Sequence, residues 1–140
     1  MRHTGYLVSR MGHVAQMRFR ERMATIGLNP REWGALNVLN AEGAITQGAL
    51  CKAVGMDPST MVSTIDELEA KGLIQRRRHP SDRRAHALHL TPEGERILIQ
   101  GRELAREAHD DLLAPLSERE RQQLHELLLR LVNATRHDVS

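Results

Sequence analysis

Cysteine, long apolar runs and a leader-like segment are all missing or nearly missing from this sequence. The single cysteine, Cys51, cannot form an internal disulfide. No uninterrupted apolar run of about 18 residues occurs, so no membrane-spanning helix is expected. The first residues also lack the apolar core of a secretory signal peptide. Together these absences predict a protein of the reducing cytoplasm.

Aromatic residues are scarce as well, with one Trp, one Tyr and one Phe among 140 residues. A core must therefore be built from Leu, Ile, Val, Met and Ala, which favours helices over a β-sandwich. The hydrophobic content of 40% and the charged content of 27% are typical of a globular chain rather than a disordered one. The length is that of a single domain.

Charge is unevenly distributed along the chain. The formal net charge is +2, but residues 71–84 contain six basic side chains and one acidic side chain, a local charge of +5. One concentrated basic segment on an otherwise slightly acidic chain indicates a polyanion bound at a defined place. On charge alone, a solvated loop is the more common explanation of such a run.

Helix-starting and helix-ending residues divide the chain into six predicted helices. The first is expected over about 5–25, where apolar residues recur at helical spacing. The other five are expected to begin after capping residues: Asn29, Thr46, Asp57, Thr91 and Ser117. Capping boxes are expected with Glu32 and Glu120. Glycines are expected to end the first four helices: Gly27, Gly43, Gly55 and Gly72.

The third and fourth helices, separated by Gly55 and Met56, are a helix-turn-helix candidate. Many all-helical proteins contain such a corner. More informative are two predicted strands, 73–78 and 86–90, joined by the turn residues of 79–82. A hairpin with a basic tip directly after a helix-turn-helix predicts a winged helix. The fold class is therefore mainly α with a small β-hairpin wing.

The two last helices are strongly amphipathic, and their apolar stripes need a partner. That partner is either the first helix of the same chain or a second subunit.

Four segments carry a resemblance to a known family. They are Asp-Pro-Ser-Thr at 57–60, the run at 65–74, the arginine-rich run at 77–85, and Leu-Thr-Pro-Glu-Gly at 90–94. In residue type, spacing and order this chain resembles the MarR (multiple antibiotic resistance regulator) family over about residues 30–100. The resemblance implies a homodimeric DNA-binding transcription regulator that recognises two half-sites of a pseudo-palindrome. Most family members are repressors, released by a phenolic or lipophilic ligand or by cysteine oxidation.

The resemblance also divides the chain, which is expected to form a single domain over 1–140. Dimerisation helices are expected at 5–28 and 92–136, and the winged helix-turn-helix module at 30–91.

The fourth predicted helix, the recognition helix of the resemblance, is the candidate for reading DNA. Short polar residues are expected on its flank away from the buried stripe: Ser59, Thr60, Ser63 and Thr64. Such side chains suit base edges and phosphates in the major groove, and the amides of the helix start suit a phosphate. The alternative is an ordinary exposed face. Many relatives are basic where this chain has Ser63 and Glu67, so the wing is expected to supply more of the affinity.

In the wing, Arg84 is expected to enter the minor groove, which attracts guanidinium groups where it is narrow. The resemblance implies that Asp82 holds the side chain of Arg84. Arg83 is expected to contact phosphate. Three further arginines are expected along the DNA backbone: Arg76, Arg77 and Arg78. The alternative for this cluster is a surface ion pair without consequence.

A ligand pocket, if the resemblance holds, lies between the dimerisation helices and the winged module. Its candidate lining residues are Met11, His13, Met17, Trp33 and Leu36, although for any one of them ordinary core is the favoured interpretation.

Other chemistry has little support in the sequence. Cys51 lies beside apolar residues and is interpreted as structural rather than redox-active. Eight histidines are present without a metal-binding spacing, so neither a metal nor a cofactor is expected. No glycine-rich phosphate loop or nucleophile motif indicates an enzyme. A winged-helix protein-interaction module remains the alternative function; Glu67 and Glu69 favour it, and the basic segment opposes it.

Overall fold

The computed structural model describes residues 3–78, 81 and 86–136, which form six α-helices and three β-strands. In chain order the elements are α1 (Thr4–Ala24), α2 (Pro30–Glu42), β1 (Ile45–Thr46), α3 (Gln47–Val54), α4 (Pro58–Ala70), β2 (Ile74–Arg78), β3 (His86–Leu90), α5 (Pro92–Leu113) and α6 (Glu118–Thr135).

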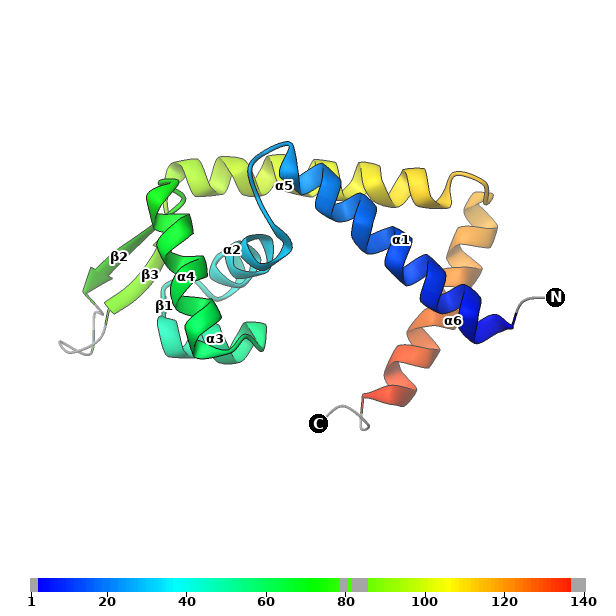
Figure 1. The fold of residues 1–140 in the computed structure, drawn as a ribbon, viewed down its shortest axis with the longest axis horizontal. Helices are drawn as coiled ribbons and strands as arrows, with labels where there is room; N and C mark the ends of the chain where they lie inside the picture. Colours follow the sequence, from blue (N-terminus) through cyan, green and yellow to red (C-terminus); the bar gives the residue numbers. More distant parts are fainter. Residues whose placement is uncertain (1–2, 79–80, 82–85, 137–140) are drawn as a thin grey trace.

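The molecule is elongated, with the sheet at one end and α6 at the other (Figure 1). Helices α2, α3 and α4 gather beside the sheet, and α5 runs from the sheet along the length of the molecule. Helix α1 packs against α5. Arg22 of α1 forms ion pairs with Glu107 and Asp111 of α5, which join the two long helices.

All five predicted helix caps are confirmed. The Asn29 side chain accepts the backbone N–H of Glu32 (2.9 Å), and the Glu32 carboxylate accepts that of Asn29 (3.1 Å). Ser117 and Glu120 form a second capping box of the same kind. The side chains of Thr46, Asp57 and Thr91 each accept a backbone N–H from the first turn of the helix that follows. These bonds satisfy donors that a helix start otherwise leaves unpaired.

The sheet is antiparallel, with strand order β1–β3–β2. Strands β2 and β3 confirm the predicted hairpin, with Arg76 opposite Leu88 and Arg78 opposite His86. Strand β1 was not predicted. Its two residues are too few to show the alternation of buried and exposed positions that identifies a strand.

The core lies between the sheet and the helices around it. The largest fully buried apolar side chains are Met23, Leu36, Leu50, Met61, Ile65, Leu68, Leu88 and Leu98. The winged helix-turn-helix is therefore built around one aliphatic core, as the scarcity of aromatic residues predicts.

Two glycines allow α5 to approach its neighbours closely. A Cβ on Gly94 would lie 2.1 Å from the carbonyl oxygen of Leu73, and a Cβ on Gly101 would lie 2.2 Å from the Trp33 ring. Real Cβ atoms do not come so close to other atoms. The Trp33 ring also meets Phe19 of α1 edge to face, with ring centroids 6.3 Å apart. Trp33 of α2 thus contacts both long helices.

Helix α6 has no buried residue. Five of its apolar side chains are 42–57% exposed: Leu127, Leu128, Leu129, Leu131 and Val132. None of the described helices has the length and apolar character needed to cross a bilayer.

Candidate nucleic-acid interface

The start of α4 is organised by Asp57. Its carboxylate accepts hydrogen bonds from the Thr60 hydroxyl (2.6 Å), the Ser59 hydroxyl (2.7 Å) and the Thr60 backbone N–H (2.9 Å). These bonds, that of the Thr60 hydroxyl foremost, hold the pKa of Asp57 well below its ordinary value. The carboxylate is therefore ionised at neutral pH. The Asp57 carboxylate thus occupies the Thr60 amide of the first turn, and the phosphate contact expected from the sequence at this helix start remains a prediction.

Two exposed serines extend along the outer face of α4. The Ser59 hydroxyl donates to Asp57, and the Ser63 hydroxyl donates to the carbonyl oxygen of Thr60 (3.0 Å). A hydroxyl has one hydrogen to donate and two lone pairs. Both serines therefore present acceptors outward, which fits the amino groups of adenine or cytosine in the major groove.

Thr64 does not lie on this face. It is 3% exposed, and its hydroxyl donates to the Thr60 carbonyl oxygen (2.8 Å). The expectation that Thr64 belongs to the exposed flank is wrong. Position 64 follows Met61 by three residues and precedes Leu68 by four, so the helical repeat places it on the buried stripe. Thr60 is half-buried at the margin of the face.

Val62 was missed by the sequence analysis. It is 44% exposed and lies between the two serines on the outer face of α4. An exposed valine on a helix that enters the major groove suits the methyl group of thymine. The sequence could have indicated this position, because Val62 is three residues from Ser59 and one from Ser63 and so lies near both serines on the helix.

The described wing arginines divide between the two faces of the sheet. Arg76 forms ion pairs with Asp66 (2.7 Å) and Glu69 (3.5 Å) of α4, so its face of β2 is turned towards that helix. Arg78 shares this face because alternate residues of a strand point the same way. Arg77 lies on the other face, where its guanidinium donates to the Gln75 side chain (3.0 and 3.2 Å).

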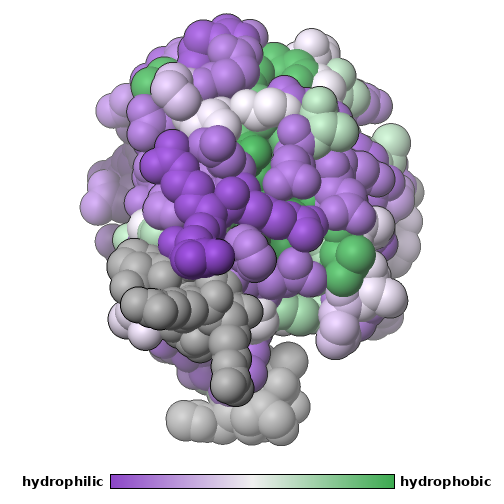
Figure 2. Space-filling view, turned by 90° about the vertical axis from the view of Figure 1, so that its left-hand side faces the viewer, coloured by the Kyte–Doolittle hydropathy of each residue, from purple (hydrophilic) through white to green (hydrophobic). Residues whose placement is uncertain are grey.

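Asp82, Arg83 and Arg84 lie outside the described residues, so their predicted DNA contacts remain predictions. The end of the molecule that carries the sheet presents a mainly hydrophilic surface (Figure 2).

An ion pair between the exposed Lys71 and the buried Glu32 holds the other end of α4. The Lys71 ammonium donates to the Glu32 carboxylate (2.5 Å) and to the carbonyl oxygen of Gly27 (2.7 Å). The Glu32 side chain is 2% exposed and also caps α2. Lys71 thereby ties α4 to the junction between α1 and α2.

The five candidate pocket residues are not brought into one cavity. Leu36 is fully buried in the core, and Trp33 is half-buried against Phe19. Met11, His13 and Met17 are exposed along α1. For Leu36 the alternative interpretation, ordinary core, agrees with the structure.

An apolar groove of about 530 Å³, here called the terminal groove, lies between α1, α5 and α6. Met11 is the one candidate pocket residue that lines it. Its other apolar lining residues include Leu7, Val8, Leu112, Leu124 and Leu128.

Cys51 and the histidines are the remaining side chains suited to redox or metal chemistry. Cys51 is partly buried, and its thiol donates to the carbonyl oxygen of Met56 (2.7 Å). His109 and His125 both line the terminal groove. Within the described part of the chain, no three His, Cys, Asp or Glu side chains are placed to hold a metal ion.

Comparisons with known proteins agree with this geometry. The family model described as the MarR family matches residues 26–85. A Thauera aromatica protein described as a transcriptional regulatory protein for the hcr operon is 37% identical over 124 residues, which is 87% of this chain and 75% of that protein.

Two solved structures extend the similarity to nearly the whole chain. A transcriptional regulator from Pseudomonas aeruginosa is 34% identical with a TM-score of 0.74, covering 91% of this chain and 96% of that one. The transcriptional repressor CouR, bound to a 23-mer DNA duplex, is 30% identical with a TM-score of 0.78, covering 93% and 92% of the two chains.

The winged helix-turn-helix fold of this chain thus agrees with the folds of these relatives. The chain belongs to the MarR family and is a DNA-binding transcriptional regulator.

Proposed function

We propose that this regulator binds a pseudo-palindromic operator as a homodimer, represses transcription there, and is released by a small-molecule ligand. The observation that carries the proposal is the pairing of two surfaces at one end of the molecule. The outer face of α4 presents polar groups and Val62, and the adjacent hairpin presents exposed arginines. The first surface suits base edges and the second suits phosphates.

The terminal helices support a homodimer. Helix α6 buries none of its apolar stripe within the chain, and the terminal groove exposes the apolar side of α1 beside it. A second copy offers the same apolar surfaces, so a two-fold interface buries both. In this proposal residues 5–28 and 92–136 form the dimer interface and residues 30–91 bind DNA. Two-fold symmetry then places the half-sites about 10 bp apart, centre to centre.

The ligand is proposed to act where the two parts of each subunit meet. Trp33 of α2 lies at this junction against Phe19 of α1, whereas the other candidates, Met11, His13 and Met17, are exposed along α1. A ligand that binds one dimer geometry better than another shifts the spacing of the recognition helices. Such a regulator works in the cytoplasm on chromosomal DNA and has no catalytic step.

The test is binding of the purified protein to promoter DNA flanking its own gene, titrated with salt and nonspecific competitor. We expect a dimer that binds specifically, with an affinity that falls steeply as salt rises. Changing Arg77 and Arg78 together to Gln should weaken binding to every duplex and lower the salt slope by about 2, about 1 per lost phosphate contact.

Arg106→Gln is the matched control, because Arg106 pairs with Glu103 on α5, away from the hairpin. Equal salt slopes for the wild type and the double variant would exclude these arginines as phosphate contacts. Weak binding that does not distinguish the promoter from competitor DNA would instead favour the protein-interaction alternative.

A further inference from the structure

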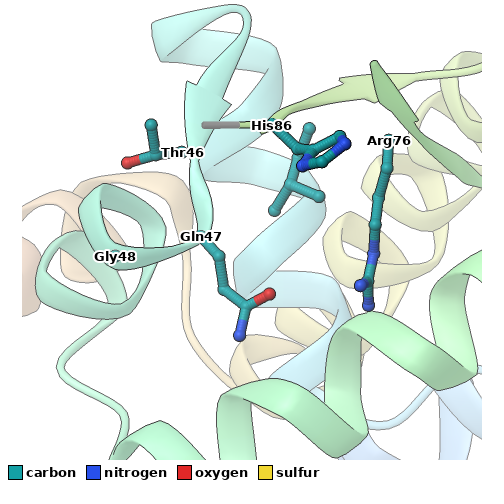
Figure 3. A pocket seen from close by; sticks show the side chains of 6 residues that line it. Thr46, Gln47, Gly48, Arg76 and His86 are labelled. Carbon is teal, nitrogen blue, oxygen red and sulfur yellow. The ribbon is translucent and has the colours of Figure 1, made fainter. Parts of the chain in front are cut away.

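A polar hollow lies between the hairpin and the helix-turn-helix, lined by Thr46, Gln47, Gly48, Arg76, His86 and Leu88. Its volume is about 280 Å³. Figure 3 shows the side chains of Gln47, Arg76 and His86 converging on it from α3, β2 and β3. We propose that this hollow holds one backbone phosphate of each operator half-site, with the side-chain amide of Gln47 and the imidazole of His86 as donors.

The path of the DNA duplex across the protein indicates what occupies the hollow. A recognition helix occupies the major groove, and a wing reaches the adjacent minor groove. One sugar–phosphate strand separates these two grooves, so it must cross the space between helix and wing. The hollow lies in that space, because Arg76 on its wall reaches across from β2 to Asp66 and Glu69 of α4. This inference rests on the proposed mode of DNA binding.

The side chains around the hollow are mainly hydrogen-bond donors. Gln47 contributes an amide NH₂, and His86 contributes a ring N–H. The guanidinium of Arg76 has five N–H donors, and its pairs with Asp66 and Glu69 leave donors for a further acceptor. These pairs also hold the side chain in place before DNA arrives, which lowers the entropy lost on binding.

The charges around the hollow are nearly balanced, and among them only Arg76 lines it. Asp66 and Glu69 contribute two negative charges, which are offset by Arg76 and by Arg78, directly opposite His86 in the sheet register. A doubly charged free anion gains little from such balanced surroundings. A phosphate of the duplex, in contrast, is brought to the hollow by the other contacts of the protein with DNA. Hydrogen-bond donors are then enough to hold it, without a net positive charge.

The strand provides a matched pair of histidines for the test. His86 and His89 lie three residues apart on β3, so they point to opposite faces of the sheet, and only His86 lines the hollow. Binding is measured by fluorescence anisotropy at fixed salt, with the promoter duplex and with a duplex of scrambled sequence. His86→Ala and Gln47→Ala should each weaken both complexes by the same factor, about tenfold for one bond to a charged acceptor.

His89→Ala should bind both duplexes as the wild type does. His86→Gln, which restores an N–H donor, should recover most of the lost affinity. In a ¹H–¹³C spectrum of the imidazoles, the His86 signal should shift when the scrambled duplex is added and the His89 signal should not.

Three results would overturn the assignment. Wild-type affinity in His86→Ala and Gln47→Ala, together with an unmoved His86 signal, would exclude a phosphate from the hollow. A loss confined to the promoter duplex would mean that these residues read bases. A full His86 shift with inorganic phosphate alone would indicate an anion effector site. Failure of the wild-type protein to bind any duplex would contradict the proposed function instead.

Discussion

At the scale of single residues, the outer face of α4 is the surface proposed to read the bases of the operator. Ser59 and Ser63 have already donated their hydroxyl hydrogens within the chain, so they present acceptors. Val62 adds one apolar contact between them. This combination favours adenine or cytosine amino groups near a thymine methyl group.

The contact proposed between Val62 and a thymine methyl group can be tested by removing that methyl group from the DNA. Once an operator is known, each thymine is replaced in turn by deoxyuridine and the dissociation constant is measured. One thymine per half-site should matter to the wild type, with a loss of about fourfold, the value of one buried methyl group. Val62→Ala should bind the thymine and deoxyuridine duplexes equally.

Ile99→Ala is the control, since Ile99 is an exposed apolar residue of α5. The thymine assignment is wrong if Val62→Ala discriminates as strongly as the wild type.

The sequence predicted this face only in part. Ser59 and Ser63 are exposed as expected, but Thr64 is buried and Val62 is exposed. Both errors came from judging by residue type. Thr64 was assigned to the exposed flank because threonine is polar, and Val62 was left out because valine is apolar. The helical repeat counted from Met61 and Leu68 assigns both correctly. The hollow beside α3 required the three-dimensional structure, since residues 47, 76 and 86 come from three separate elements.

At the scale of elements, the ion pair between Glu32 and Lys71 joins the recognition helix to the rest of the chain. Glu32 caps α2 and is almost completely buried, while Lys71 follows the last residue of α4 and also bonds the Gly27 carbonyl oxygen. A lone carboxylate in that position would be buried without a counter-charge. The pair is therefore more important for the position of α4 than a surface salt bridge would be.

We expect Lys71→Met to lower the free energy of unfolding by about 3 kcal/mol, because it leaves the Glu32 charge unpaired. Adding Glu32→Gln should restore much of the loss, since it removes the charge and keeps the cap. Urea unfolding measures both variants. Lys52→Met, at the only other lysine, should change stability by no more than about 0.5 kcal/mol. A double variant no more stable than Lys71→Met would mean that the unpaired charge is not the cause.

Element boundaries were the most predictable part of the fold. Cap residues and glycines act locally, so Asn29, Asp57 and Ser117 mark helix starts in the sequence as they do in the structure. The ion pair of Glu32 with Lys71 was not predictable, because it joins residues 39 positions apart. Strand β1 was missed because it depends on pairing with β3 rather than on its own two residues.

At the scale of the whole molecule, the apolar stripe of α6 remains exposed in the single chain. Leu124 and Leu128 line the terminal groove together with Leu7 and Val8 of α1. The sequence predicted that these stripes need a partner but left open whether the partner is α1 or a second subunit. Within one chain α1 packs on α5, and α6 remains without a buried residue.

Leu128→Asp should therefore convert the homodimer into a monomer, because it places a charge in the terminal groove. Sedimentation velocity measures the mass, and anisotropy measures binding to the operator. The affinity should fall by about 100-fold or more, since each monomer engages one half-site without the other.

Gln122→Asp adds the same charge two residues from Leu124, about 200° around the helix, and should remain a dimer. A Leu128→Asp protein that sediments as a dimer would show that the interface lies elsewhere.

The position of Trp33 has a practical consequence. It is the only tryptophan, and its ring is enclosed by Phe19 of α1 and by the Gly101 position of α5. All tryptophan emission of the protein thus originates where the DNA-binding half meets the long helices. Any effector that changes this junction alters the wavelength or intensity of that emission. The protein carries its own optical probe, and a library of small molecules can be screened without a label and without knowledge of the operator.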